Sequence, residues 1–131
     1  MTKIKLCGLS RPCDIRAANE LLPDYIGFVF APKSRRYVCP EKAAELKRML
    51  DPGIRAAGVF VDEKPQVIEA LVSRGVIDAV QLHGREDEDY IQDLRKRLGN
   101  TLIIQAFSIC SERDAGRAER SCADLVLVGS P

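Results

Sequence analysis

The sequence lacks any paired-cysteine motif. Five cysteines are scattered along 131 residues, and no C-x-x-C pair occurs among Cys7, Cys13, Cys39, Cys110 and Cys122. An odd number of cysteines without that spacing argues against a zinc site and against a disulfide framework. We expect most of the five to be buried, because free cysteine is among the most buried residue types.

A charge excess and a long apolar segment are also missing. The net charge of +1 argues against a general nucleic-acid or membrane-surface binder. The first residues, Met1-Thr-Lys-Ile-Lys-Leu6, contain only a short apolar run, and no stretch approaches the roughly 20 apolar residues that span a bilayer. The sequence therefore predicts a cytoplasmic protein that holds its ligand through local charge.

No glycine-rich phosphate-binding motif follows a predicted strand. Cys7-Gly-Leu-Ser-Arg-Pro12 is neither G-x-G-x-x-G nor a Walker loop, which disfavours nicotinamide and nucleoside-triphosphate chemistry. A receiver domain would need an acidic cluster at the ends of its first and third strands to hold magnesium. Cys7-Gly8 and Val61-Asp62 do not supply one.

What the sequence does contain is a regular alternation of strands and helices. Six strands are expected at Lys3–Cys7, Asp24–Phe30, Ile54–Val61, Asp78–His83, Leu102–Ile109 and Ala123–Val128. Five helices are expected at Cys13–Leu22, Pro40–Leu50, Pro65–Arg74, Asp87–Leu98 and Ser111–Arg120. This order predicts an α/β fold made of parallel βα repeats, in one domain over residues 1–131. Because the smallest eight-unit barrels have roughly 200 residues, we expect an incomplete TIM (β/α)8 barrel.

Strand parity distinguishes a barrel from an open sheet. In the first strand Lys5 and Cys7 lie opposite the apolar Leu6, and in the fourth Gln81 and His83 share one face. A barrel turns such polar residues into its lumen, whereas a doubly wound sheet would bury them under helices. Parity therefore favours a barrel in which Cys7 and His83 are the last inward residues of their strands. A flavodoxin-like sheet is the alternative, and a central first strand would support it.

A basic loop follows the second strand. Pro32 ends that strand, and Lys33, Arg35 and Arg36 come next. Parallel sheets bind ligands just beyond the carboxyl ends of their strands, so we expect an anionic small molecule there. Arg35 and Arg36 point in opposite directions in an extended segment. One can therefore bind a carboxylate or phosphate while the other stays in solvent.

Two other residues are candidates for chemistry. Cys7 precedes Gly8 and a turn into a helix, where backbone N–H groups and nearby cations favour a thiolate that serves as base or nucleophile. A buried strand-end cysteine without a chemical role is the alternative. His83 is the only histidine, and it either lines the site or takes part in its chemistry.

Four motifs, in order, resemble those of phosphoribosylanthranilate isomerase, an enzyme family of tryptophan biosynthesis. They are Lys3-Ile-Lys-Leu-Cys-Gly-Leu9, Gly27-Phe-Val-Phe-Ala-Pro-Lys-Ser-Arg-Arg-Tyr-Val38, Gly58-Val-Phe-Val61 and Val80-Gln-Leu-His-Gly84. The resemblance spans the whole chain, which corresponds to about the first two-thirds of an eight-unit barrel.

The resemblance implies an Amadori rearrangement of N-(5-phosphoribosyl)anthranilate to 1-(2-carboxyphenylamino)-1-deoxyribulose 5-phosphate, without a metal or a cofactor. It implies that Cys7, in Lys5-Leu-Cys-Gly8, is the general base. It also implies that Arg36 binds the anthranilate carboxylate and that His83 lines the site.

The sequence departs from the family in two ways. The family's general acid is an aspartate at the end of the sixth strand, where this sequence has Gly129, and Asp124 lies at that strand's opposite end. We also expect no seventh and eighth units, whose loops bind the substrate phosphate in this type of barrel. We therefore expect a shortened isomerase with very low activity. The alternative is a catalytically inactive βα fragment that acts as an assembly or ligand-binding module.

The expected sheet also has two open edges, at its first and sixth strands. An unpaired strand edge is a template for pairing with another chain. The sequence therefore predicts self-association, or pairing with a complementing C-terminal segment.

Overall fold

Strands and helices alternate in the order that the hydrophobic pattern predicts. The structure, a computed structural model, describes residues 3–108, 116, 118 and 121–129. The strands are β1 Lys5–Cys7, β2 Tyr25–Val29, β3 Arg55–Phe60, β4 Ala79–Leu82, β5 Leu102–Ser108 and β6 Leu125–Gly129. The helices are α1 Pro12–Leu21, α2 Pro40–Met49, α3 Pro65–Ser73 and α4 Glu88–Leu98. The helix expected at Ser111–Arg120 lies outside the described residues, apart from 116 and 118.

Proline marks the start of three helices. Pro12, Pro40 and Pro65 each occupy the first position of a helix, where the missing N–H costs nothing and the fixed φ suits the helix. The first helix therefore begins at Pro12, one residue before the predicted start. The fourth begins instead at a capping aspartate, since the carboxylate of Asp87 accepts the backbone N–H of Tyr90 at 2.8 Å.

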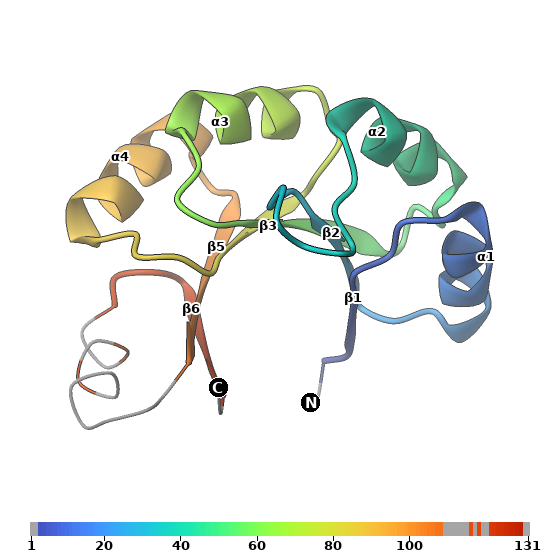
Figure 1. Ribbon diagram of the computed structural model, residues 1–131, viewed down its shortest axis with the longest axis horizontal. Coiled ribbons are helices and arrows are strands. Elements are labelled where there is room, and N and C mark those ends of the chain that lie inside the picture. The colour runs from blue at the N-terminus through green and yellow to red at the C-terminus, as the bar shows by residue number, and fades with distance from the viewer. Residues whose placement is uncertain (1–2, 109–115, 117, 119–120, 130–131) are drawn as a thin grey trace.

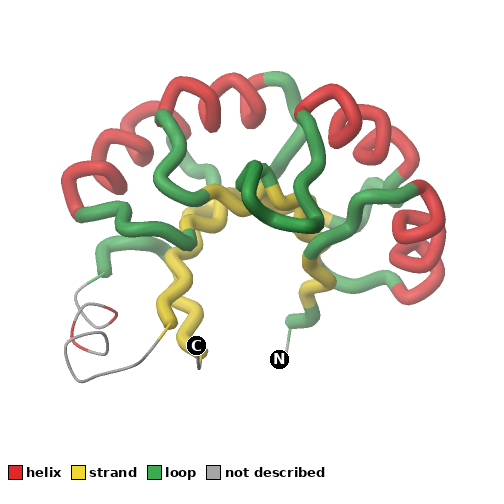
Figure 2. Tube along the Cα trace, in the orientation of Figure 1, coloured by secondary structure: helices red, strands yellow, loops and turns green. Residues whose placement is uncertain are grey.

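The sheet is wholly parallel and its strand order follows the sequence from β1 to β6. Figure 1 shows it curled, with α1 to α4 along the convex side, and Figure 2 shows the strands lining the concave side. Because β1 lies at an edge and not at the centre, the flavodoxin-like alternative is wrong. The predicted parallel βα fold with the curvature of a partial TIM barrel is confirmed.

The main core lies between the sheet and the helices. Each helix contributes apolar residues three or four positions apart, and the strands contribute every second residue, as both periodicities require. The largest fully buried side chains in this layer include Ile15, Ile26, Phe28, Leu46, Phe60, Ile68, Leu82 and Leu94. Full burial of one such side chain contributes roughly 1.5–3 kcal/mol, so this layer accounts for most of the favourable free energy of folding.

Three aspartates fix how neighbouring strands pair. Each stands directly before an even-numbered strand, and its carboxylate accepts a backbone N–H at the start of the preceding strand. The pairs are Asp24 with Ile4 at 2.7 Å, Asp78 with Ala56 at 2.9 Å, and Asp124 with Ile103 at 2.8 Å. The backbone N–H of each aspartate donates in return to the carbonyl of the same partner, at 3.0, 2.7 and 3.0 Å. A shift in register would break both bonds of a pair.

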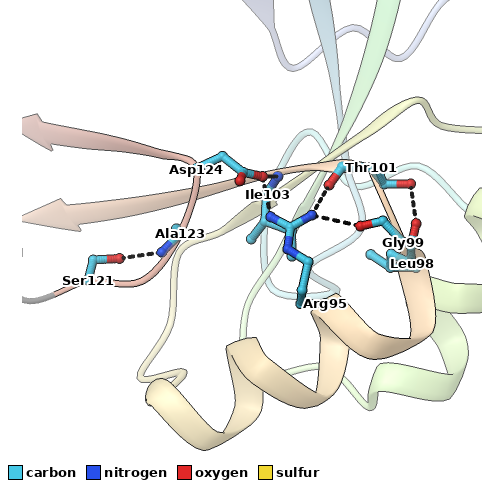
Figure 3. A network of polar contacts seen from close by, with 8 residues as sticks. All are labelled: Arg95, Leu98, Gly99, Thr101, Ile103, Ser121, Ala123 and Asp124. Carbon is cyan, nitrogen blue, oxygen red and sulfur yellow. Dashed lines mark hydrogen bonds and ion pairs between the residues drawn. The ribbon is translucent and has the colours of Figure 1, made fainter.

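Cations hold two of these carboxylates in place. Lys47 of α2 pairs with Asp78, and Arg95 of α4 pairs with Asp124. Arg95 also donates to the carbonyls of Gly99 at 2.9 Å and Thr101 at 2.8 Å (Figure 3). The end of α4, the start of β5 and the start of β6 are thereby joined by one guanidinium group. Asp124 thus lies at the amino end of β6, as the sequence predicts.

Candidate active site

Cys7 ends β1 and faces the concave side of the sheet. It pairs with Gly27 of β2, and a Cβ placed on Gly27 would lie only 2.8 Å from the Sγ of Cys7. The preceding residue, Leu6, packs on the opposite, helix-covered face. The exposed thiol is therefore at the carboxyl end of a barrel strand, where this architecture places its chemistry.

The prediction that most cysteines are buried is wrong for those that the structure describes. Cys7, Cys13, Cys39 and Cys122 are all exposed, and Cys110 lies outside the described residues. The physical reason is their placement at element ends. Cys13 lies in the first turn of α1, and Cys39 and Cys122 lie in connections, where no neighbouring layer covers a small side chain.

The loop after β2 carries Arg36 back to Cys7. Val38 donates its N–H to the carbonyl of Val29 at 2.9 Å, which folds the loop over the strand end. The Nη1 of Arg36 then donates to the carbonyl of Cys7 at 3.3 Å. Both arginine side chains are exposed, but Arg35 has no polar partner among the described residues. The structure therefore selects Arg36 from the two adjacent arginines.

Gly8 makes this approach sterically acceptable. Its φ of +82° lies in the left-handed region, which favours glycine. A Cβ at this position would lie 2.3 Å from the Cδ of Arg36 and 2.7 Å from its Nη1. Glycine is therefore required at position 8 for two reasons: the backbone turn after β1 and the position of the Arg36 guanidinium group.

A pocket of about 420 Å³ lies where β1 meets α1, and its lining includes Cys7, Gly8, Asp14 and Arg36. The carboxylate of Asp14 accepts the backbone N–H groups of Ser10 and Arg11, each at 3.1 Å. The Ser10 bond, foremost, lowers the pKa of this carboxyl group, so Asp14 is ionised at neutral pH. The residues that line this pocket thus include a cysteine, whose thiol suits proton transfer, and an arginine, whose guanidinium group suits a planar anion.

His83 lies at the same edge of the sheet but apart from this pair. It directly follows β4, its backbone N–H donates to the carbonyl of Phe60 at 2.9 Å, and its side chain is exposed. Two strands separate β4 from β1, and His83 is not among the residues that line the pocket of Cys7. The structure therefore brings Cys7 and Arg36 together, and places His83 elsewhere along the same rim.

The sequence analysis did not predict two carboxylates near His83, those of Glu86 and Asp62, which bind backbone N–H groups of two loops. Glu86 is buried, with 4% of its surface exposed, and it accepts the N–H groups of Asp62 at 2.8 Å and Gly84 at 2.9 Å. Asp62 in turn accepts the N–H of Arg85 at 2.7 Å. These bonds join the loops that follow β3 and β4. The available signal was an acidic residue shortly after each of two neighbouring parallel strands.

The described residues contain no group of three or more His, Cys, Asp or Glu side chains placed to hold a metal ion. Within the same residues, no helix is long and apolar enough to cross a membrane.

Comparison with known proteins identifies relatives over nearly the whole chain. Residues 4–131 match the family model of N-(5′-phosphoribosyl)anthranilate (PRA) isomerase. The chain is 47% identical over 108 residues to the N-(5′-phosphoribosyl)anthranilate isomerase of Lactiplantibacillus plantarum. The aligned residues make up 82% of this chain and 51% of the relative.

Solved structures show the same similarity. The crystal structure of phosphoribosyl anthranilate isomerase from Thermotoga maritima has a TM-score of 0.87 and 34% identity, and the match covers 100% of this chain and 63% of that one. A phosphoribosyl anthranilate isomerase in complex with reduced 1-(o-carboxyphenylamino)-1-deoxyribulose 5-phosphate also has a TM-score of 0.87, with 35% identity over 100% of this chain and 66% of that one. The chain spans about half the length of the curated relative named above.

The close contact between the Arg36 side chain and Gly8 can be tested by comparing two glycine substitutions. Gly8→Ala and Gly75→Ala both place alanine at a left-handed φ, and each is expected to lower the free energy of unfolding by about 1–2 kcal/mol in urea titrations. Only Gly8→Ala introduces a clash, because nothing lies within 4 Å of a Cβ on Gly75. The side-chain Nε–H resonance of Arg36 should therefore move in Gly8→Ala and stay in place in Gly75→Ala. Equal behaviour of that resonance in the two variants would contradict the described contact.

Proposed function

The chain belongs to the N-(5′-phosphoribosyl)anthranilate isomerase family, and we propose that it serves that family's Amadori rearrangement. The substrate is N-(5-phosphoribosyl)anthranilate and the product is 1-(2-carboxyphenylamino)-1-deoxyribulose 5-phosphate, in cytoplasmic tryptophan biosynthesis. The compound bound by the relative of known structure is a reduced form of this product, which supports the choice of substrate.

One observation carries the proposal. The thiol of Cys7 and the guanidinium group of Arg36 lie at the same end of β1, and the Nη1 of Arg36 is 3.3 Å from the carbonyl oxygen of Cys7. The substrate has a carboxylate on its aromatic ring and an acidified C–H on its sugar. A guanidinium fork suits the carboxylate, and a thiolate suits removal of the proton.

The reaction depends on two proton transfers before the final tautomerisation, and Cys7 carries out the second. A proton reaches the ribose ring oxygen as the C1′–O bond opens, and the lone pair of the anthranilate nitrogen forms a C=N bond. The thiolate of Cys7 then removes the proton from C2′, which gives an enolamine that tautomerises to the ketone. Arg36 holds the anthranilate carboxylate, and His83 lines the opposite part of the rim.

The first of these proton transfers has no donor at the expected position. Strand β6 ends at Gly129, which pairs with Ser108 of β5 at the carboxyl edge of the sheet. Glycine has no side chain that can donate a proton. We therefore propose that this chain turns over its substrate very slowly, and that an aspartate at position 129 would supply the missing step.

An assay of anthranilate fluorescence tests the proposal. We expect Gly129→Asp to raise kcat/KM by at least about 10-fold, since a positioned general acid contributes roughly 10²–10⁴-fold. Adding Cys7→Ala to Gly129→Asp should abolish the gain, because the base is then lost.

Cys13→Ala in the same background is the matched control. Cys13 is also an exposed cysteine, but it lies on α1 outside the lining of the Cys7 pocket, so the gain should persist. If the variant with Cys7→Ala and Gly129→Asp is as active as Gly129→Asp alone, Cys7 is not the base and the proposed function fails.

The sheet edges support a further part of the proposal. In the described part of the chain, β1 and β6 each pair on one side only. Ile4 beside β1 is 58% exposed, and Leu125 of β6 is 47% exposed. Apolar side chains beside unpaired backbone groups favour association. We propose that the chain self-associates, or accepts a complementing C-terminal segment, through these edges.

Sedimentation at several protein concentrations tests self-association. The expected result is an average mass above that of one chain which rises with concentration. Leu125→Lys should reduce it, because the charge would be carried into the interface. Leu21→Lys, on the outer side of α1 where Leu21 is 71% exposed, should leave it unchanged. A single-chain mass at every concentration would refute self-association.

A further inference from the structure

The side chain of Lys5 points along β1 toward the mouth of the site. The backbone of Lys5 pairs with Tyr25, one layer of side chains below Cys7. Its Cε nevertheless lies 3.2 Å from the position of a Cβ on Gly27, which is the partner of Cys7. Two residues of a strand span roughly 6.6 Å, so the lysine side chain reaches up by one layer. Its ammonium group is therefore carried toward the thiol.

Gly27 provides the space that both side chains occupy. The Sγ of Cys7 lies 2.8 Å from the same Cβ position, so it and the Cε of Lys5 are no more than about 6 Å apart. Lys5 is half-buried on the concave side. Any side chain at position 27 would fill this space and separate the thiol from the lysine.

Among the described side chains of the concave face, Lys5 has no acidic partner. The described inward side chains of β1 to β5 belong to Lys5, Cys7, Tyr25, Gly27, Val29, Arg55, Ala57, Val59, Ala79, Gln81, Leu102, Ile104 and Ala106. None of these is a carboxylate, and Lys5 forms no hydrogen bond or ion pair with a described residue. Two of these residues, Cys7 and Tyr25, have side chains that ionise to anions, and a thiol ordinarily ionises at a lower pH than a phenol. The sulfur of Cys7 is therefore the more readily formed anion near this ammonium group.

Arg36 and Asp14 are two other charged residues that line the pocket of Cys7, and both already have backbone hydrogen-bond partners. Arg36 donates to the carbonyl of Cys7, and Asp14 accepts the backbone N–H groups of Ser10 and Arg11. Burial lowers the pKa of the Lys5 ammonium group, and the charge of Cys7 opposes that change. This sign agrees with a cation that gains from an anionic sulfur.

We infer that Lys5 is a positioning residue, whose ammonium group pairs with the sulfur of Cys7 and favours its thiolate form. The inference rests on the proposed function for its purpose, since a thiolate is what the base requires. The pairing itself does not depend on turnover. A cation beside a cysteine is a recognised cause of thiol reactivity.

The rate at which iodoacetamide alkylates Cys7, followed peptide by peptide, tests the inference. We expect Lys5→Met to slow alkylation of Cys7 at pH 7 by roughly fivefold or more, because a positive charge within about 4–6 Å favours an ionised partner. The pH profile of the Cys7 rate should move to higher pH. Cys13 and Cys39 in the same molecules serve as internal references for an unchanged fold.

Two further variants distinguish a specific pairing of Lys5 with Cys7 from a general effect of positive charge on the concave face. Lys5→Arg keeps the charge and should hold the rate within about twofold of the original. Arg55→Met removes a cation from the same concave face, next to Tyr25 in the register, and should leave the Cys7 rate unchanged. If Lys5→Met and Arg55→Met give the same Cys7 rate, relative to Cys13, the inference is overturned.

A reciprocal measurement covers the case in which Lys5→Met does not fold. Cys7→Ser removes the anionic partner, so the pKa of Lys5 should fall further and its acetylation at pH 8 should speed up by about twofold or more relative to Lys33. An unchanged ratio would reject the pair. Lys5-dependent alkylation together with no isomerase activity in Gly129→Asp would refute only the proposed function, whereas turnover by Gly129→Asp with Lys5-independent alkylation would refute only this inference.

Discussion

The register between β1 and β2 determines which side chains of β1 face the concave side of the sheet, where the candidate site lies. Cys7 lies opposite Gly27, and this pairing turns the thiol to the concave side. A slip of one residue would turn it under α1, because side chains alternate between the faces of a strand. β1 has only three residues, so the two-way contact between Asp24 and Ile4 stabilises its position. Asp78 and Asp124 make the same pair of hydrogen bonds to β3 and β5, and so stabilise the register of those strands as well.

Two glycines then allow the groups of the site to meet. Gly27 leaves space on the concave side for the sulfur of Cys7 and the stem of Lys5, and Gly8 leaves space for Arg36 above the strand end. The helix-covered side of the same strands is filled with large apolar residues. The site therefore lies where the concave side of the sheet lacks side chains, across the strands from the apolar core.

Much of this arrangement follows from sequence pattern. Apolar strand segments and helical spacing predicted the six strands and the four helices of the described residues to within one or two residues, and parity predicted the inward direction of Cys7. Other features depend on contacts between distant segments. Nothing local distinguishes Arg36 from Arg35, because the choice depends on how the loop folds back onto Val29. The upward course of Lys5 likewise depends on Gly27, and the exposure of the cysteines depends on which connections remain uncovered.

The direction of the Cys7 side chain is the claim on which the site depends, and nuclear Overhauser contacts across β1 and β2 measure it directly. The account predicts cross-strand contacts of Cys7 with Gly27 and of Lys5 with Tyr25, with the β-protons of Cys7 near the α-protons of Gly27. Cross-strand pairing of Cys7 with Ile26 or Phe28 would place the thiol beneath α1 and contradict the account.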